Sequence, residues 1–396
     1  MTGALDGIRV LDLGTRIGAP FAATLLGELG ADVIKIEQPG TGDFLRTIPP
    51  FDGDVSLFWA VEGRGKRSVT IDLSKPRGQE LLKKLVPHAD VLVENFTPGT
   101  LERWDLAPDD LRALNPRLIV SRVSVYGQDG PYRDRPGLDR NGIALGGLLG
   151  ITGFPDAPPV RPGVIIADYV SALFNTVGIL AALVERTNSS QGQQVELALY
   201  ESVLRVMEWT IAAYDRLGIV RERSGNRLPN SAPIDNYETS DGRYVCVAAA
   251  GDVLFPRLCG AIGRDDLLED ARFSTLRERA ANAEAVNEEV AAWCRARTLD
   301  EIESILVKHE VPVSRVYTID EIVADPQVQR RAAIVSVDDP VLGPVRQQAP
   351  VPRLDRSPLR IQRGAPRLGE HTGEVLGEML GMSSGEIEEL RRDGIV

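Results

Sequence analysis

Short apolar runs alternate with amphipathic stretches through the N-terminal part of the chain. Runs of strand length lie at residues 8–13, 32–37, 68–73, 90–94 and 118–123. Apolar positions at helical spacing separate several of them, at residues 19–29, 78–85 and 108–114. Repeated strand–helix–strand units favour right-handed parallel pairing, with helices on both faces of one sheet. The pattern therefore predicts an α/β fold whose large domain is a Rossmann-like open parallel sheet.

One carboxylate interrupts the pattern where a further helix is expected to begin. The apolar run 164–167 stops at Asp168. Apolar residues then recur at helical spacing: Val170, Leu173, Phe174, Val177, Leu180 and Val184. Asp is a common N-cap because its side chain accepts hydrogen bonds from the free N–H groups of the first turn. Position alone thus favours a helix cap, and a catalytic role for Asp168 depends on the sequence around it.

Small, polar and basic residues gather where the predicted strands meet loops. Among them are Arg16, Gly18, Gly42, Asp43, Arg46, Arg64, Lys66, Arg67, Asn95, Phe96 and Arg103. Arg and Lys suit phosphates, and glycine lets the backbone approach a ligand closely. Each loop alone could be a solvated turn. Together, in a chain of net charge −12, they favour a nucleotide-like anionic ligand at the carboxyl ends of the strands.

A nicotinamide dinucleotide is the alternative ligand for such a sheet. Glu37, at the end of the second predicted strand, would then bind the ribose. The first turn, residues 14–20, lacks the spaced G-x-G-x-x-G pattern, and Pro20 removes one N–H group from the set that would face an anion. The sequence therefore disfavours a nicotinamide-dependent enzyme.

Composition limits the classes of partner. The net charge of −12 and the pI of about 5.0 disfavour nucleic acid and anionic membranes as partners. Three cysteines without paired spacing indicate reduced thiols in a cytoplasmic protein, and three histidines are too few for a His-rich metal site. The N-terminus lacks the pattern of a signal peptide, and the apolar stretch 177–184 is too short to span a bilayer.

The second half of the chain predicts a smaller domain. A long helix is expected over residues 200–217, an Asp-Gly hairpin over 237–248, and helices over 254–262 and 276–295. The expected organisation is therefore a large α/β domain at 1–205, a linker at 206–230, a small α+β domain at 231–330 and a return segment at 331–396 that packs on the large domain.

Seven fragments, in order, resemble the family III CoA-transferases, which include formyl-CoA transferase, carnitine CoA-transferase and the dicarboxylate CoA-transferases and are related to α-methylacyl-CoA racemase. The fragments are LDGIRVLDLGTRIGAPFAATLLGELGADVIKIEQPGTGD, GRGKRSVTIDL, ADVLVENFTPGTLERWDL, LNPRLIVSRVSVYGQDGPYRDRPGLD, RPGVIIADYVSALFNTVGILAALVER, SAPIDNYETSDGRYVCVAA and APRLGEHTGEVL. The resemblance implies coenzyme A or acyl-CoA as substrate with no tightly bound cofactor, small carboxylic acids as the other substrates, and an interlocked homodimer.

The resemblance also implies roles for individual residues. Asp168 matches the catalytic aspartate of the transferases. Asp139 matches an acidic residue that follows a catalytic His of the racemase, and Leu138 stands at that His position here. Residues matched to the binding of CoA are Thr15, Arg16 and Gly18 beside the thioester and Asn95, Phe96 and Arg103 along the adenine and phosphates. Lys75 lies next to, rather than on, a family lysine that contacts CoA.

A carboxylate nucleophile suits the movement of CoA between acids, because it can hold the acyl group and then CoA covalently. Such a site needs an oxyanion stabiliser and no metal. Backbone N–H groups near Gly18 and Ala19 or near Gly146–Gly147 are candidates, and the latter pair could equally be a hinge. Weaker candidates, each with a structural alternative, are Arg46, Arg135 and Arg161 for substrate acids and Tyr126 and Tyr169 for orienting Asp168.

The resemblance, which is strongest to the dicarboxylate branch, thus implies a CoA-transferase that moves CoA from a succinyl-CoA-like donor to a short carboxylic or dicarboxylic acid. An acyl-CoA racemase or isomerase is disfavoured, because Leu138 cannot exchange a proton. No glycine run follows residue 225, which departs from formyl-CoA transferase. A CoA-binding protein without catalysis is the remaining alternative.

Overall fold

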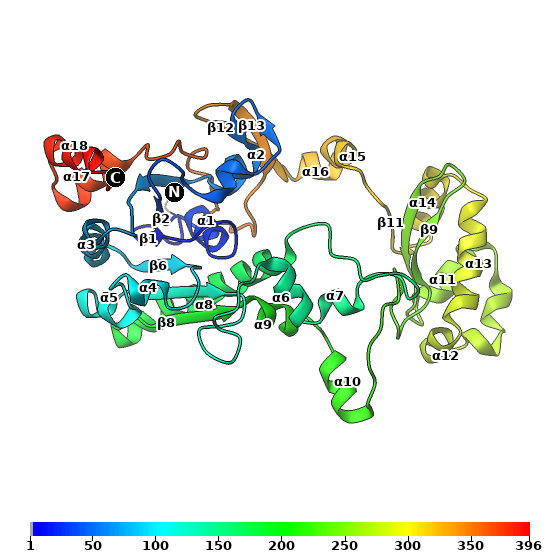
Figure 1. The fold of residues 1–396 in the computed structure, drawn as a ribbon. Coiled ribbons are helices and arrows are strands. Elements are labelled where there is room, and N and C mark those ends of the chain that lie inside the picture. The colour runs from blue at the N-terminus through cyan, green and yellow to red at the C-terminus, as the bar shows by residue number, and fades with distance from the viewer. Residues whose placement is uncertain (1–2) are drawn as a thin grey trace. The chain divides into compact units, whose positions relative to one another are not determined.

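The computed structural model describes residues 3–396, which divide into two compact units (Figure 1). Within the described residues, unit 1 comprises 3–148, 162–212 and 330–396, and unit 2 comprises 149–161 and 213–329. The prediction placed residues 149–161 in the large domain, and this placement is wrong. Part of the predicted linker, residues 206–212, belongs to unit 1.

Unit 1 is built on a six-stranded parallel sheet with the order β5-β2-β1-β6-β7-β8. The strands are β1 (Arg9–Asp12), β2 (Asp32–Glu37), β5 (Lys66–Thr70), β6 (Val91–Glu94), β7 (Ile119–Ser124) and β8 (Gln194–Ala198). The predicted α/β class and parallel sheet are confirmed. The third predicted strand begins two residues earlier than expected, at Lys66, because this lysine is buried against a carboxylate rather than solvated.

The strand order reverses between β1 and β6. From β1 the chain builds outward through β2 to β5, and it then returns to build β6, β7 and β8 on the other side. Loops that leave the carboxyl ends of β1 and β6 therefore diverge and open a crevice between them. The fold alone marks this crevice as the place to look for a ligand.

Helices cover both faces of the sheet. On one face α3, α5 and α17 bury leucines and valines against strand residues such as Leu11, Ile34 and Leu92. On the other face α1 and α8 contact each other and the strands. The helices of unit 1 are α1 (Pro20–Glu28), α2 (Leu57–Glu62), α3 (Pro76–Leu85), α4 (Thr100–Arg103), α5 (Pro108–Leu114), α6 (Asp139–Leu145), α8 (Ile166–Ser189), α9 (Leu199–Arg205), α17 (Thr372–Leu380) and α18 (Ser384–Arg392).

The helix α8 is the longest in the structure and carries Asp168 in its first turn. The stretch 177–184 is part of this helix, which as a whole is long and apolar enough to cross a membrane by length and composition alone. Its inward side buries Ala172, Asn175 and Ile179, and the helix packs on β7, β8 and α9. These contacts are those of a core helix beside a sheet.

Short hairpins and 3-10 turns complete unit 1. The hairpin strands are β3 (Phe51–Asp52) with β4 (Val55–Ser56) and β12 (Ile334–Asp339) with β13 (Gly343–Gln348). The 3-10 helices are η1 (Phe44–Thr47) and η2 (Val86–His88). The return of residues 330–396 to this unit brings α17 beside β5.

Unit 2 contains an antiparallel sheet of order β11-β10-β9, formed by β9 (Ile234–Glu238), β10 (Tyr244–Ala248) and β11 (Val313–Arg315). The expected hairpin is present, and Gly242 takes the left-handed conformation that its turn requires. Helical elements are α10 (Thr210–Leu217), α11 (Leu254–Ile262), η3 (Asp265–Leu268), η4 (Ala271–Phe273), α12 (Leu276–Ala281), α13 (Ala283–Arg295), α14 (Leu299–Lys308) and α15 (Ile319–Ala324). Helices α7 (Leu148–Ile151), α10 and α16 (Pro326–Arg330) include residues of both units.

Two predicted long helices are each two shorter ones. The stretch 200–217 breaks between α9 and α10, where Glu208 has a φ of 53° that no right-handed helix allows. The stretch 276–295 breaks at Asn282, which ends α12 and precedes α13. Apolar spacing continued through both breaks, so periodicity alone could not reveal them.

Candidate active site

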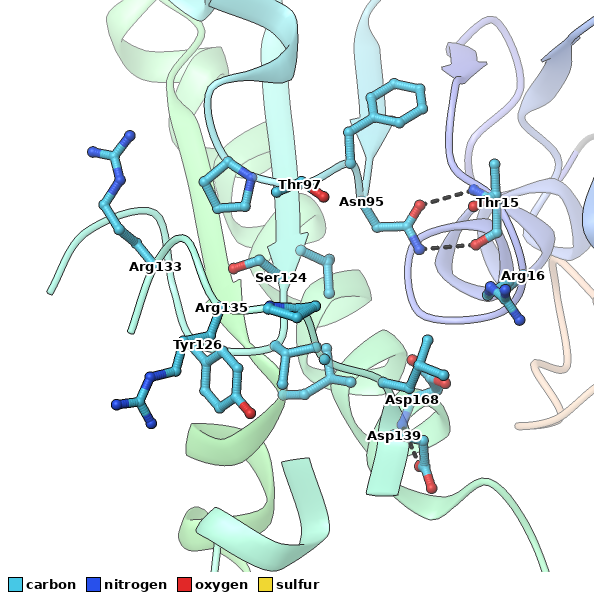
Figure 2. Close-up of a pocket in the computed structure, with 18 residues that line it drawn as sticks. Thr15, Arg16, Asn95, Thr97, Ser124, Tyr126, Arg133, Arg135, Asp139 and Asp168 are labelled. Atoms are coloured by element: carbon cyan, nitrogen blue, oxygen red, sulfur yellow. Dashed lines mark hydrogen bonds between the residues drawn. The ribbon is translucent and has the colours of Figure 1, made fainter. Parts of the chain in front are cut away.

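Two loops are tied together at the point where the strand order reverses. One follows β1 and contains Thr15, and the other follows β6 and contains Asn95. The Thr15 N–H donates to Asn95 Oδ1, and Asn95 Nδ2 donates to the Thr15 carbonyl, both at 2.8 Å (Figure 2). The amide of Asn95 thus pairs with the backbone as a neighbouring strand would, and it fixes the loop beside the crevice.

Arg16, the next residue in the first loop, is held in an uncommon backbone conformation. Its φ is 64°, in the left-handed region that costs a non-glycine residue about 1–2 kcal/mol. Its N–H donates to Asp43 Oδ1 at 3.1 Å, and its guanidinium lies 3.8 Å from the ring centre of Phe44. Such strain persists where surrounding contacts over-determine the conformation, and this is often the case at functional sites.

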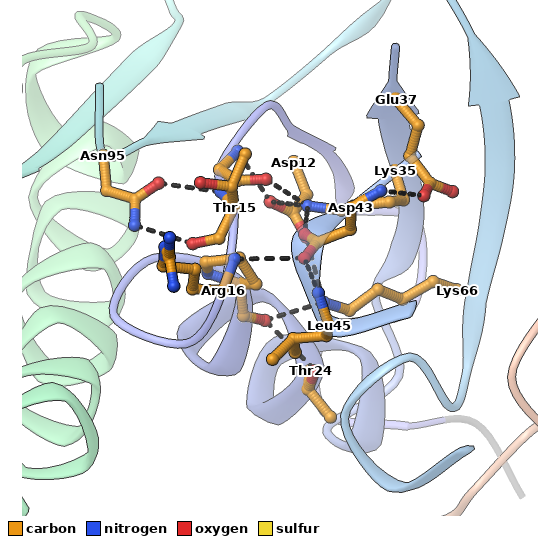
Figure 3. Close-up of polar contacts among 12 residues, drawn as sticks. Asp12, Thr15, Arg16, Thr24, Lys35, Glu37, Asp43, Leu45, Lys66 and Asn95 are labelled. Carbon is orange, nitrogen blue, oxygen red and sulfur yellow. Dashed lines mark hydrogen bonds and ion pairs between the residues drawn. The ribbon is translucent and has the colours of Figure 1, made fainter. Parts of the chain in front are cut away.

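A buried network of charges supports the same loop from below (Figure 3). Asp12 receives Lys66 Nζ at 2.9 Å and Lys35 Nζ at 3.4 Å, and Lys35 also pairs with Asp43 at 3.0 Å. Lys35 further donates to the Gly14 carbonyl. All four side chains are at most 1% exposed, so the pairs are shielded from water and salt. The two lysines are paired with the two aspartates, so neither lysine is free to bind an anionic ligand.

Asp168 is the third residue of α8, and it does not cap that helix. The capping acceptor is Asp139, at the start of α6, whose Oδ1 receives the N–H of Ala167 at 2.7 Å and the N–H of Asp168 at 3.3 Å. The interpretation of Asp168 as an N-cap is therefore wrong. Its carboxylate has no hydrogen-bond donor among the described residues and faces the crevice (Figure 2).

The surroundings of Asp168 favour its protonated form. Burial, followed by the negative charge of Asp139, raises the pKa of Asp168 to about 7, against the opposing effect of Arg16. Gly18 lies against the same carboxylate: a Cβ atom added there would be 3.0 Å from Asp168 Oδ1. Glycine at this position therefore leaves the carboxylate the space to react.

A pocket connects these groups within unit 1. It is lined by Thr15, Arg16, Asn95, Phe96, Thr97, Pro98, Val123, Ser124, Val125, Tyr126, Arg133, Arg135, Pro136, Gly137, Leu138, Asp139, Asp168 and Leu199. Figure 2 shows Arg16 on the side of Asp168, and Arg133 and Arg135 on the opposite side. The only carboxylates in this lining are Asp139 and Asp168, and it contains no histidine.

Most residues that the resemblance assigned to the site meet here, and three of them, Gly18, Lys75 and Arg103, do not line this pocket. Thr15, Arg16, Asn95, Phe96, Asp139 and Asp168 line it, and Gly18 touches Asp168. Lys75 is outside, where its Nζ donates to the Gly394 carbonyl at 2.8 Å. Arg103 is exposed and bonds Thr100 at 2.8 Å, but its guanidinium and that of Arg133 both approach Gly99.

Several basic residues expected at an anion site are instead paired inside the protein. Arg46 binds both oxygens of Glu37 at 2.8 Å and stacks on Trp59. Arg64 pairs with Glu28, and Arg67 pairs with Asp32. Together with Lys66 they stabilise the fold, and the hypothesis that they bind an anion is wrong. The pairing of Glu37 also removes the ribose ligand of the dinucleotide alternative.

Among the weaker candidates, Arg135 and Tyr126 line the pocket and Tyr169 points elsewhere. The Tyr169 hydroxyl donates to Glu62 at 2.8 Å, so it does not orient Asp168. Arg161 is not part of the pocket lining. Gly146 and Gly147 pack against Val203 and Met207, which leaves the loop at Gly18 and Ala19 as the remaining oxyanion candidate.

Sequence reasoning missed Arg133 and the supporting network. Arg133 was hidden in an exposed run of charged residues, where nothing distinguishes it from a solvated loop. Asp12, Lys35 and Lys66 carried a usable signal, since each interrupts or begins an apolar strand. A charge in a buried strand requires a partner, so three such charges on adjacent strands predict one another.

The fold and pocket define an α/β protein with a ligand site at the reversal of its parallel sheet. The chain matches CoA-transferase family III over residues 5–372, and it belongs to that family. It is a CoA-transferase. No group of three or more His, Cys, Asp or Glu side chains that could hold a metal ion occurs within residues 3–396.

Three proteins illustrate the similarity of this chain to known proteins. The chain is 43% identical to succinyl-CoA–D-citramalate CoA-transferase of Chloroflexus aurantiacus, over 99% of this chain and 98% of that protein. It is 43% identical, with the same coverage, to the beta subunit of the succinyl-CoA–L-malate CoA-transferase of that organism. A crystal structure of a CaiB/BaiF family protein from Brucella suis superposes with a TM-score of 0.84 and 33% identity, covering 96% of this chain and 100% of that one.

Proposed function

We propose that this enzyme transfers CoA from succinyl-CoA to a dicarboxylic acid and that Asp168 is the nucleophile. One observation carries the proposal: a half-buried carboxylate faces the pocket without a hydrogen-bond donor, while a second carboxylate, Asp139, caps its helix. The identity of the acids is supported by the relatives named for succinyl-CoA with D-citramalate and with L-malate.

The chemistry proceeds by two exchanges on one carboxyl group. Asp168 attacks the thioester carbonyl of succinyl-CoA, which gives a mixed anhydride and releases CoA thiolate. The thiolate attacks the aspartyl carbonyl of the anhydride, which forms an aspartyl–CoA thioester and releases succinate. The acceptor carboxylate then attacks this thioester and again gives an anhydride and thiolate. Attack of the thiolate on the acceptor carbonyl completes the new acyl-CoA and regenerates Asp168.

The surroundings of Asp168 suit these steps. Each addition places negative charge on a carbonyl oxygen, and the N–H groups of Gly18 and Ala19 are proposed to stabilise that charge, because an added Cβ at Gly18 would lie 3.0 Å from Asp168 Oδ1. Gly18 also leaves room for the bulk of a tetrahedral centre. Arg16 favours the ionised, nucleophilic form of Asp168 because it lowers the pKa that burial has raised.

Asn95, Phe96 and Arg103 are proposed to hold the nucleotide part of CoA. Phe96 lies between the pocket and a second cavity at the ends of β1, β2 and β5, where it meets Trp104 edge to face at 5.2 Å. An aromatic pair of this kind offers a surface for a base. Arg103 and Arg133, which both approach Gly99, supply positive charge for phosphates. Lys75, held at the chain end, would need to leave its carbonyl partner to contribute.

Racemisation is the second candidate that the geometry addresses. Proton exchange at the α-carbon needs a base on each face of the substrate. Leu138 lines the pocket at the position where the racemase has histidine, so this site has carboxylates but no imidazole. One assay distinguishes CoA transfer from racemisation. The enzyme is incubated with succinyl-CoA and either D-citramalate or L-malate in deuterium oxide. Formation of the acceptor's CoA thioester without α-deuteration supports transfer, and α-deuteration without transfer refutes it.

We also infer that two copies of the chain associate. On α8, Leu173, Val177 and Val184 share one side of the helix and are 52%, 63% and 67% exposed. An apolar stripe of this kind is costly in water and suits a partner surface. Light scattering should give twice the chain mass of 43.1 kDa. A monomer at micromolar concentration would refute the inference.

A further inference from the structure

Arg16 differs from Arg46, Arg64 and Arg67 in having no anionic partner. Arg46, Arg64 and Arg67 each bind a carboxylate within unit 1. No carboxylate among residues 3–396 pairs with the Arg16 guanidinium, which rests on the face of Phe44. A half-buried cation without an anion is costly unless a ligand completes the pair.

Several independent contacts fix the backbone that carries this cation. The Asn95 amide binds both the N–H and the carbonyl of Thr15, the residue before Arg16, and Asp43 receives the Arg16 N–H. Asp43 is itself anchored by Lys35 inside the buried network. The left-handed backbone at Arg16 is therefore maintained against its intrinsic cost. Arg16 lines the pocket on the side of Asp168, and these contacts fix the backbone from which its guanidinium extends (Figures 2 and 3).

The positive charges of the pocket lie on two sides, with the nucleophile near one of them. Arg133 and Arg135 lie across the pocket from Arg16, and Asp168 lies on the side of Arg16. The CoA thioester of a dicarboxylic acid carries negative charge at both ends in the same way. Its phosphates lie far from the thioester, and its free carboxylate lies only two methylene groups beyond the thioester carbonyl in succinyl-CoA.

We propose that Arg16 binds the free, non-reacting carboxylate of the dicarboxylic acyl group and so makes the enzyme selective for dicarboxylic over monocarboxylic acids. This specificity role rests on the proposed function, in which Asp168 attacks the other end of the same acyl group. A guanidinium suits it because its planar fork matches a carboxylate with two parallel hydrogen bonds. Stacking on Phe44 leaves the edge of the fork available for those bonds.

Binding to a protein that cannot react tests the proposal without turnover. In an Asp168→Asn background, calorimetry would compare succinyl-CoA, butyryl-CoA and free CoA; butyryl-CoA has the same carbon chain without the free carboxylate. Arg16→Gln should weaken succinyl-CoA binding about 10- to 100-fold, the usual effect of losing a charged hydrogen-bonded pair. It should leave butyryl-CoA and CoA within about twofold. Arg16→Lys, with one charge but no fork, should lie between.

Two matched controls assign the effect. Arg46 also stacks on an aromatic ring but is paired with Glu37, so Arg46→Gln should not change the ratio of succinyl-CoA to butyryl-CoA affinity. Arg133→Gln, on the opposite side of the pocket, should weaken all three ligands together. Equal losses for succinyl-CoA and butyryl-CoA in Arg16→Gln would overturn the proposal and assign Arg16 to CoA itself. Thermal melts of each variant show whether it is folded, and Arg16→Lys serves if Arg16→Gln is not.

The outcome is separable from that of the proposed function. If Arg16→Gln loses selectivity but the wild-type enzyme never forms a covalent adduct, only the nucleophilic role of Asp168 fails. If the adduct forms and the ratio of affinities is unchanged in Arg16→Gln, only the specificity role of Arg16 fails.

Discussion

Two groups of charged side chains lie on the two sides of the β1–α1 loop and differ in whether they are paired within the protein. Beneath the β1–α1 loop, Asp12, Lys35, Asp43 and Lys66 are buried and satisfied by one another. Above it, Asp168 has no hydrogen-bond donor among the described residues, and the Arg16 guanidinium is unpaired. The lower group fixes the backbone, and the upper group is left available for a ligand. Net charge cannot distinguish the two groups, because both combine acidic with basic residues.

The largest expected effect comes from the unpaired carboxylate. Asp168→Asn keeps the volume of the side chain and removes the nucleophile, so CoA transfer should fall about 10⁴-fold or more, as for other nucleophile replacements. The affinity for CoA should change little. Steady-state transfer and calorimetry would measure the two quantities. Substantial residual transfer in Asp168→Asn would show that the unpaired carboxylate is not needed for catalysis, and the functional difference between the two groups would be lost.

The buried group should instead control stability. Lys66→Met leaves Asp12 with the Gly14 N–H and its longer contact to Lys35, and breaking a buried pair costs about 3–5 kcal/mol. Urea denaturation would measure this loss in the free energy of unfolding. A matched surface control is Arg77→Gln, which removes exposed pairs with Glu389 and Asp393 and should have no measurable effect. Equal effects of the two substitutions would contradict the assignment of the network to stability.

The comparison also explains how far the sequence could lead. Apolar spacing predicted five strands and helices on both faces of the sheet, and the resemblance singled out Asp168. Neither predicted which charged side chains pair inside the protein and which face the pocket. Pairs such as Arg46 and Glu37 depend on strand register and loop conformation, which no local sequence pattern shows. Asp168 appeared as a cap because the apolar run 164–167 placed the expected helix start there. The helix begins two residues earlier, and the residue that caps it, Asp139, is distant in sequence.

The pH dependence of the rate should show the raised pKa of Asp168. Transfer needs the carboxylate form, so kcat/KM should fall about tenfold per pH unit below a pKa of about 7. Asp139→Asn removes the neighbouring negative charge and keeps an oxygen for the N–H groups of Ala167 and Asp168. It should therefore move the profile to lower pH. A value of kcat/KM that does not change between pH 5 and pH 8 would contradict a raised pKa of Asp168.

The same shift predicts a smaller effect on stability. Between the ordinary pKa of 3.8 and about 7, the folded protein keeps a proton on Asp168 that the unfolded chain releases. The free energy of unfolding therefore falls as pH rises through this range. Asp168→Asn avoids the cost, so its Tm should exceed that of the wild type by about 2–4 °C at pH 8 and by less at pH 5. Calorimetric scans at the two pH values test the sign, and a larger gain at pH 5 would contradict it.

Intact-protein mass spectrometry after mixing the enzyme with succinyl-CoA tests the central claim most directly. We expect a mass gain equal to CoA minus water, sensitive to hydroxylamine and absent in Asp168→Ala. An adduct that persists in Asp168→Ala, or no adduct in a wild-type enzyme that transfers CoA, would contradict the role of Asp168 as the nucleophile.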